Sequence, residues 1–360
     1  MKLIHCADLH LDSPMETHMS REQAAKRNVE ILKTFCRLTE YAAQNAVQLV
    51  LIAGDLFDGA RVRARTVDTV LDAMKKTPSV TYLYVPGNHD GAAAAFADRN
   101  LPQNFVQFTD TWQTFRAENL VVSSIHMTPQ NAESLYETLP EAPENCCNIV
   151  MLHGQTGTVS GVDCVNLNQL KGKGIDYLAL GHLHRYAEQP LDENGVYCYC
   201  GCLEGRGFDE CGDKGFVLLE TKGKRIKAKF KPFASRMLHR VSVDITGAEN
   251  EAEVYQKMKQ EAEKEGIPSS DMVEFLLKGN ADPSVPLSAA YLTQLAADQF
   301  FFEKVKDESR LAIRAETYQN DISLKGEFIR LVLSSEESEE EKARLIRIGL
   351  EALSGEEISL

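Results

Sequence analysis

The sequence predicts an α/β protein in which helices cover a parallel or mixed β-sheet, followed by a small α+β domain. Short apolar runs alternate with helical patterns through the first half of the chain, and the pattern then changes twice, near Val196 and near Ser235. The chain of 360 residues is long enough for two domains. Its 43% apolar and 26% charged residues are typical of a globular protein with a full core.

Elements of the first half alternate in type. Apolar runs at Lys2–Cys6, Leu49–Ala53 and Thr81–Val85 are predicted to be strands, and the segments between them, Arg21–Asn45 and Arg65–Lys76, show helical spacing. This order of strands and helices is typical of a parallel or mixed sheet. Two later apolar runs are predicted to be further buried strands: Asn148–Leu152 and Asp176–Leu180.

The second half begins with three strand-like segments that predict an antiparallel meander: Val196–Cys200, Gly215–Thr221 and Arg225–Phe233. Four segments beyond Ser235 predict a small α+β domain: His239–Ile245, Glu249–Glu265, Met272–Lys278 and Pro286–Gln299. Two helical patterns end the chain, Leu324–Ser334 and Glu336–Leu353. We therefore expect a first domain at residues 1–234, an α+β domain at 235–335 and a C-terminal helix at 336–360.

Net charge and cysteine content limit the class of protein. A net charge of −14 argues against a protein that coats nucleic acid by bulk electrostatics, although bound cations could still attract phosphate groups locally. A DNA substrate would then need a local basic surface or a partner for much of the binding. The nine cysteines are scattered, and the sequence shows neither an export signal nor a membrane-spanning apolar run. We expect reduced thiols and a cytoplasmic location.

Polar clusters of Asp, Asn and His follow five of the predicted strands, where ligand sites of α/β sheets form. The clusters are Asp8-Leu9-His10, Gly54-Asp55, Gly87-Asn88-His89-Asp90, His153-Gly154 and Gly181-His182-Leu183-His184. Their oxygen and imidazole ligands suit a pair of divalent cations such as Mn²⁺, Mg²⁺, Fe²⁺ or Zn²⁺. Asp55 is the expected bridge, because one carboxylate can offer an oxygen to each ion. Two cations roughly 3.5–4 Å apart can share a hydroxide of lowered pKa and hold a phosphate for in-line attack.

Histidines outside these clusters are interpreted as packed or surface residues: His5, His18, His126 and His239. Five of the nine histidines lie inside the clusters, and this concentration favours a metal site over coincidence.

The order of the motifs, D-x-H, G-D, G-N-H-D, H and G-H-x-H, resembles that of the calcineurin-like metallophosphoesterases over about Met1 to Phe233. The resemblance implies a β-sandwich flanked by helices and two divalent metal ions, with Mn²⁺ the expected activator. It assigns Asp8, His10, Asp55 and His184 to one ion, and Asp55, Asn88, His153 and His182 to the other. It also places His89 beside the metals, to stabilise the transition state or to protonate the leaving oxygen.

Longer segments are similar to the bacterial DNA repair exonucleases of the SbcD/YhaO type: IHCADLHLDSP, GDLFD, VPGNHD and YCGCLEGRGFDECGDKGFVLLE. DISLKGEFIRLVL extends this similarity to the second domain. The resemblance implies a DNA exonuclease in DNA repair, with endonuclease activity left open, and an SbcC-like coiled-coil ATPase as partner. The role of Asp58 is also open, because archaeal and eukaryotic relatives carry a histidine there.

Two alternatives remain at this stage. The same metal centre could serve a phosphomonoesterase or a nucleotide phosphodiesterase, although GAAAAF after GNHD lacks the basic residue of some phosphatases. In the other alternative, the chain is a DNA-end-binding scaffold for the ATPase. The helical pattern at Leu324–Leu353 fits a partner contact, a homodimer contact or a core element equally well.

Three further features have a plain structural interpretation that we prefer. Arg61, Arg63 and Arg65 are typical of a solvated loop, with phosphate contact as the alternative. The lysines between Lys222 and Lys231 are typical of an exposed edge strand. The spacing of Cys198, Cys200 and Cys202 favours apolar packing over a zinc site.

Overall fold

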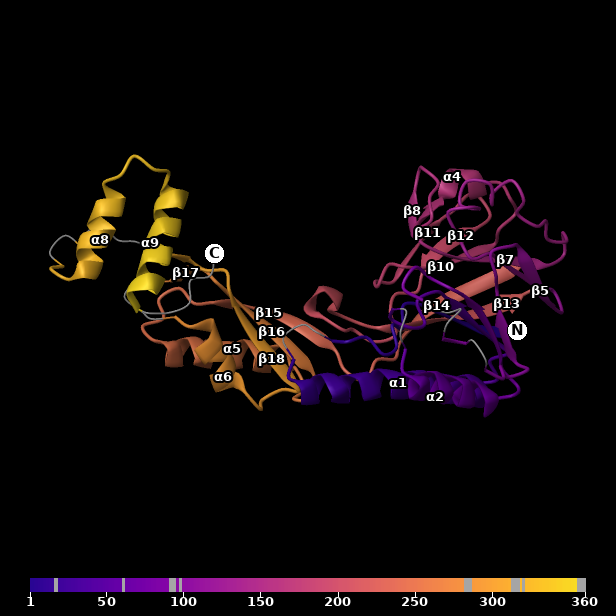
Figure 1. Ribbon diagram of the computed structural model, residues 1–360, viewed down its shortest axis with the longest axis horizontal. Coiled ribbons are helices and arrows are strands. Elements are labelled where there is room, and N and C mark those ends of the chain that lie inside the picture. The colour runs from indigo at the N-terminus through magenta and orange to yellow at the C-terminus, as the bar shows by residue number, and fades with distance from the viewer. Residues whose placement is uncertain are drawn as a thin grey trace. The chain divides into compact units, whose positions relative to one another are not determined.

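The computed structural model describes residues 1–15, 19–59, 62–90, 95–96, 99–281, 287–311, 318 and 321–354. Arg61 and His18 lie outside these described residues. The chain divides into two compact units, Met1–Met237 and Leu238–Leu360, and each is described by itself (Figure 1).

A six-stranded mixed sheet forms one half of the first unit, in the order β14-β13-β1-β2-β3-β4. Four of its strands pair in parallel: β1 (Lys2–Cys6), β2 (Leu49–Ala53), β3 (Thr81–Val85) and β4 (Phe105–Gln107). An antiparallel hairpin completes the sheet: β13 (Gly215–Lys222) and β14 (Arg225–Pro232). Strand β14 is the sheet edge, and its exposed Lys227 and Lys229 are placed as expected for edge-protecting lysines.

A second six-stranded sheet forms the other half, in the order β11-β12-β10-β7-β6-β5. Its central strands run in parallel: β6 (Leu120–Ser124), β7 (Cys147–His153), β10 (Tyr177–Gly181) and β12 (Val196–Tyr199). Antiparallel strands lie at both edges: β5 (Gln113–Ala117) and β11 (Ala187–Pro190).

The predicted three-strand meander is wrong in one respect. Val196–Tyr199 pairs in parallel with β10 in the second sheet, and only β13 and β14 form the expected hairpin. The physical reason is that β12 is covered on both faces. Cys198 packs into the core between the sheets, while Tyr199 packs into the core on the outer face of the second sheet. Burial on both faces is typical of a parallel strand.

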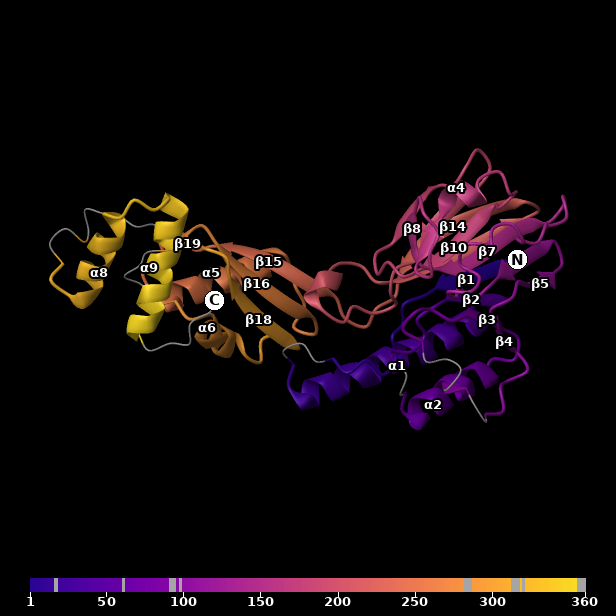
Figure 2. The same ribbon diagram turned by 45° about the horizontal axis from the view of Figure 1, so that its top comes forward.

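The core between the two sheets joins residues of both, such as Leu3 and Leu51 from the first and Ile149 and Ala179 from the second. The outer face of the first sheet is covered by α1 (Arg21–Gln44) and α2 (Ala64–Lys75), as Figure 2 shows. Short elements cover part of the outer face of the second sheet. They are β9 (Cys164–Asn166), which pairs with β8 (Gln155–Gly157), and α4 (Leu167–Leu170). The expected sandwich flanked by helices is confirmed.

Cysteines of the first unit behave as apolar residues. Cys198 and Cys200 belong to the core between the sheets, and Cys202 is also buried. Burial raises the pKa of the Cys198 thiol to about 12, so this group stays protonated near neutral pH. These three thiols therefore pack as small apolar side chains.

The second unit contains a parallel sheet of β15 (Leu238–Asp244), β16 (Met272–Lys278) and β18 (Phe302–Asp307). Two helices pack on it: α5 (Glu251–Lys264) and α6 (Ala289–Ala296). The described residues of this unit also contain a short ladder, β17 (Asn280–Ala281) with β19 (Arg310–Leu311), and two helices, α8 (Leu324–Leu333) and α9 (Glu339–Ser354). Within the described residues, none of the helices combines the length and apolar character that a bilayer crossing requires.

His5 gives the first unit a predictable pH dependence. Burial of this β1 side chain lowers its pKa from 6.5 to about 3. The native state therefore keeps His5 neutral while the unfolded chain takes up a proton below pH 6.5. The contribution of neutral His5 to the unfolding free energy is therefore fully present above about pH 6.5, and it is lost progressively as the pH falls toward 3. We expect His5 alone to remove about 2 kcal/mol of unfolding free energy between about pH 7.5 and about pH 5.

Urea unfolding followed by the fluorescence of Trp112, the only tryptophan, would measure this effect in the first unit. The His5→Gln variant should lose about 2 kcal/mol less than the parent chain over the same pH interval. Gln130→Asn, at an exposed position of the first unit without a titratable group, is the control and should keep the parental slope. Equal slopes for the parent and His5→Gln would contradict the prediction.

Candidate metal centre

The clusters predicted at the strand ends converge at one end of the sandwich. Asp8, Asp55 and Asn88 follow β1, β2 and β3 of the first sheet, while His153 and His182 stand at the ends of β7 and β10 of the second. Backbone hydrogen bonds continue beyond the strands: His10 N–H donates to the Asp55 carbonyl over 2.9 Å, and Gly59 N–H donates to the His89 carbonyl over 2.9 Å. These bonds fix the loops that carry the clusters.

Several of these residues adopt an unusual backbone conformation. The φ angles of Asp8, His10, Asp55 and His182 are 52°, 44°, 50° and 108°. A non-glycine residue with positive φ costs on the order of 1–3 kcal/mol where the conformation is strained, and such residues cluster at functional sites. The strain directs four polar side chains of both sheets to one place.

Two glycines make the close packing of the loops possible. A Cβ at Gly87 would lie 2.3 Å from Asp55 Oδ1, and a Cβ at Gly54 would lie 2.1 Å from His153 Nδ1. Gly54 also has a φ of +90°. Any larger residue at either position would displace a side chain of the cluster.

One pair of histidines, His10 and His184, is held with the Nε2 atoms of the two rings facing each other. His10 Nδ1 lies 3.4 Å from the Asp58 carboxylate, and His184 Nδ1 lies 2.5 Å from the Glu210 carboxylate. Carboxylates accept hydrogen bonds, so both Nδ1 atoms carry a proton and the Nε2 atoms are the ring nitrogens left to bind a cation. These two Nε2 atoms are 3.2 Å apart. A cation beside them would satisfy both.

A second group of possible ligand atoms meets around His153. His153 Nδ1 donates to the Ala53 carbonyl over 2.9 Å, which turns Nε2 toward Asn88 Oδ1 at 3.0 Å and Asp55 Oδ2 at 3.3 Å. Burial alone would lower the pKa of His153, but the Asp55 carboxylate outweighs it and raises the pKa to about 9. A bound cation would replace this proton.

Asp55 lies between the two groups. Its Oδ2 is 3.3 Å from His153 Nε2 and 3.6 Å from His10 Nε2. The opposing oxygen, Oδ1, accepts a hydrogen bond from His89 N–H over 2.9 Å. Burial would raise the pKa of Asp55, but the hydrogen bond from His153 lowers it to about 2, so the carboxylate is charged. This is the geometry expected of a bridging ligand.

Ligand atoms of the described residues gather in sets compatible with metal binding: Asp8, His10 and His184; Asp8, Asp55 and His153; and His10, Asp58 and His89. Each set lies within 4.8 Å. The donor atoms are carboxylate oxygens and imidazole nitrogens, so they fit hard to borderline divalent cations. His182 joins through its ring, whose centroid is 5.5 Å from that of His153. All seven predicted ligands are therefore brought together.

Hydrogen bonds to the backbone orient the carboxylates. Both oxygens of Asp8 accept from His182 N–H, at 2.8 and 3.0 Å, and this contact joins the first sheet to the second. Asp90 accepts from the N–H groups of Gly87 and Phe57 at 2.9 and 2.7 Å. Asp90 thus organises the loops.

His89 and Asp58 form the exposed rim of the centre. The His89 side chain is 53% exposed, and its Nδ1 lies 3.4 Å from Asp58 Oδ1. The same oxygen faces His10 Nδ1 at 3.4 Å, so Asp58 orients two imidazoles at once. The hydrogen bond from His10 is the main reason why the pKa of Asp58 is lowered. Asp58 is a positioning residue in this arrangement.

Two residues of the centre were not predicted from the sequence: Arg206 and Glu210. They lie in the long connection between β12 and β13, and Glu210 is 6% exposed. Besides His184, Glu210 binds the Arg206 backbone N–H over 2.7 Å and its guanidinium over 3.2 Å. Burial would raise the pKa of Glu210, but the His184 hydrogen bond lowers it to about 2. The only sequence feature that could have pointed to Glu210 is its position as an acidic residue in the glycine-rich segment CLEGRGFDECG.

Replacement of Glu210 tests its positioning role. We expect Glu210→Gln to weaken divalent metal binding by about 10–100-fold, because the His184 Nδ1–H loses its charged acceptor. Titration with Mn²⁺ in competition with a fluorescent chelator measures the change. Glu188→Gln, at an exposed position on β11, is the matched control. Unchanged affinity in Glu210→Gln would show that His184 does not need this carboxylate.

Arg63 has a structural partner. Its backbone N–H donates to Asp12 over 2.7 Å, and its Nε lies 3.2 Å from the same carboxylate, while its side chain is 68% exposed. This agrees with the interpretation of a solvated loop.

Comparison with known proteins gives matches of three kinds. A family model described as "Calcineurin-like phosphoesterase" matches residues 1–186. The chain is 28% identical over 305 residues to the uncharacterised metallophosphoesterase YhaO of Bacillus subtilis, covering 78% of this chain and 72% of that protein. It is 25% identical over 286 residues to the DNA double-strand break repair protein Mre11 of Sulfolobus acidocaldarius, and this match covers 74% of this chain and 73% of that protein. A solved dimetal phosphatase from Danio rerio aligns at a TM-score of 0.42 and 13% identity, over 64% of this chain and 95% of that one.

Proposed function

This chain belongs to the calcineurin-like phosphoesterase family, and we propose that it is a two-metal DNA phosphodiesterase that acts as an exonuclease in DNA repair. Mn²⁺ is the proposed activating ion, and the cytoplasm the proposed location. The observation that carries the proposal is the convergence of possible ligand atoms. The Nε2 atoms of His10 and His184 lie 3.2 Å apart, and His153 Nε2 meets Asn88 Oδ1 and Asp55 Oδ2 beside them.

Each side chain of the centre has a distinct role in this proposal. Two divalent cations, when bound, supply a water of lowered pKa and neutralise the charge of the phosphate. Asp55 joins the two ligand groups and keeps its negative charge. Asn88 offers a neutral oxygen at the exposed side of the site. His89 is exposed and held by Asp58, so it can reach the leaving oxygen of a bound phosphodiester and protonate it.

DNA is the proposed substrate because of the similarity to relatives named for DNA double-strand break repair. The acidic overall charge indicates that this chain does not bind DNA by bulk electrostatics. We therefore propose that a partner contributes to DNA binding, with an SbcC-like coiled-coil ATPase as the first candidate and a homodimer as the second. Leu324 and Leu331 of α8 are 72% and 66% exposed, and such apolar side chains suit a protein contact.

Hydrolysis of end-labelled DNA tests the function. Purified chain with Mn²⁺ should shorten duplex or single-stranded DNA from an end, and Asp55→Asn should abolish the reaction. Cleavage of a 4-nitrophenyl phosphomonoester without cleavage of DNA would favour the phosphatase alternative. DNA binding without hydrolysis of any ester would favour the scaffold alternative.

A further inference from the structure

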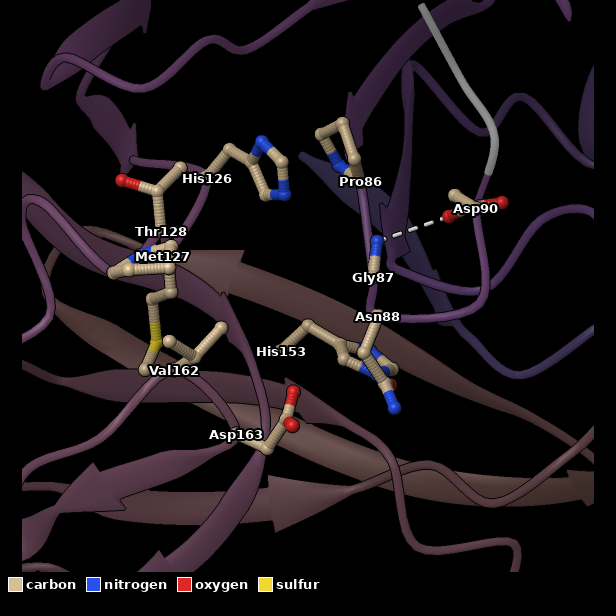
Figure 3. A pocket seen from close by; sticks show the side chains of 11 residues that line it. Pro86, Gly87, Asn88, Asp90, His126, Met127, Thr128, His153, Val162 and Asp163 are labelled. Carbon is tan, nitrogen blue, oxygen red and sulfur yellow. Dashed lines mark hydrogen bonds between the residues drawn. The ribbon is translucent and has the colours of Figure 1, made fainter. Parts of the chain in front are cut away.

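A cavity of about 430 Å³ opens beside the candidate metal centre, on the side of Asn88 and His153 (Figure 3). Its size lies within the range of about 300–1,000 Å³ that is typical of small-molecule sites. One wall is formed by the loop after β3 and the other by the segments around Met127 and Val162. A group attached to a phosphate at the metal centre would therefore find space here.

The walls of the cavity suit a flat ring. Met127 and Val162 both line the cavity; Met127 is buried and Val162 is 36% exposed, so Val162 offers most of the apolar surface. In Figure 3 the imidazole of His126 extends across the cavity toward the ring of Pro86. Pro86 is buried, whereas His126 is half-buried, and an imidazole is a surface on which a heteroaromatic base can stack.

Polar groups at the cavity restrict the charge of its occupant. Asp163 is exposed and lines the cavity together with Thr128. No Lys or Arg is found among the described residues that line it. A second phosphate would meet a carboxylate without a counter-charge. An uncharged ring that bears N–H or O–H donors would instead donate a hydrogen bond to Asp163.

We propose that this cavity is a nucleoside subsite for the nucleotide whose phosphate lies at the metal centre. The base stacks against His126 above the apolar surface of Met127 and Val162, and a donor of the base or sugar binds Asp163. The sequence indicates a packed or surface role for His126, and the structure places it at this cavity. The subsite rests on the proposed phosphodiesterase function and adds a preference for esters that carry a base.

Binding measurements on the Mn²⁺-loaded chain test the subsite with three probes: dAMP, phenyl phosphate and orthophosphate. Isothermal titration should show dAMP binding at least about tenfold more tightly than phenyl phosphate. His126→Ala and Asp163→Asn should each weaken dAMP binding by about three- to tenfold. Val162→Trp should fill the cavity and weaken dAMP binding by about tenfold or more. All three variants should bind orthophosphate within about twofold of the parent.

The matched control is Val159→Trp, because Val159 is 68% exposed and is not among the residues that line the cavity. It should keep the parental affinity for dAMP. Parental dAMP affinity in all three cavity variants would overturn the subsite, as would equal binding of dAMP and phenyl phosphate by the parent chain. If the subsite were overturned in this way but the parent chain still bound orthophosphate, the proposed phosphodiesterase function of the metal centre would stand. Failure to bind any of the three probes would overturn both proposals.

Discussion

Asp55→Asn is expected to lower the hydrolysis of bis(4-nitrophenyl) phosphate by at least about 10³-fold, and to lower bound metal from two ions to one or none. One oxygen of Asp55 faces both His153 and His10, at 3.3 and 3.6 Å. An amide at this position carries no charge and offers one acceptor instead of two. Loss of the bridge should therefore disturb both ligand groups at once.

Metal content by plasma mass spectrometry and steady-state rates, measured on the same preparation, check this result. Asp72→Asn, at an exposed position on α2, is the matched control and should keep the metal content and the steady-state rate of the parent. Retention of two ions together with a rate within about tenfold of the parent would show that Asp55 is not the bridge. Thermal unfolding of both variants separates this outcome from a loss of structure.

His89→Gln is expected to lower the rate of DNA hydrolysis by about 10²–10⁴-fold while metal content stays parental. His89 stands at the exposed rim, and its contact with Asp55 is made by the backbone N–H, which the substitution retains. A proton donor matters most for a poor leaving group such as a deoxyribose oxygen. The loss should therefore be much smaller for a 4-nitrophenyl ester.

Parallel assays on labelled DNA and on bis(4-nitrophenyl) phosphate measure this difference. Equal losses on both substrates would assign His89 to stabilisation of the phosphate rather than to proton transfer. Unchanged rates on both would remove it from the mechanism. Metal titration of the variant shows whether the centre itself is intact.

The residues of the candidate centre could be predicted because they follow apolar strands in sequence. Asp8, Asp55 and Asn88 come directly after buried runs of one sheet, so local pattern alone brings them to the same edge. Glu210 could not be predicted in this way. Its contact with His184 depends on the path of the connection between β12 and β13, and nothing local distinguishes it from a surface acid. The role of Asp58 became visible only when its two imidazole partners were placed.

The fold was predicted where one face of a strand or helix is clearly apolar. The strands Lys2–Cys6, Leu49–Ala53 and Thr81–Val85 have the predicted bounds. The pairing of Val196–Tyr199 was wrong because a strand buried on both faces shows no alternation that identifies its neighbour. The edge strand Gln113–Ala117 was not predicted, since its side chains are mostly polar or exposed.

The centre draws its ligands from both sheets, and this has a consequence for the folding of the first unit. Asp8 of the first sheet binds the backbone of His182, and His153 of the second sheet binds the Ala53 carbonyl. A cation held between these segments binds only the closed sandwich, so its binding free energy is added to that of folding. With free metal at about 100 times its dissociation constant, this linkage contributes about 2.7 kcal/mol. Substitutions of the ligands would then act on the abundance of the folded protein under metal-rich conditions as well as on its chemistry.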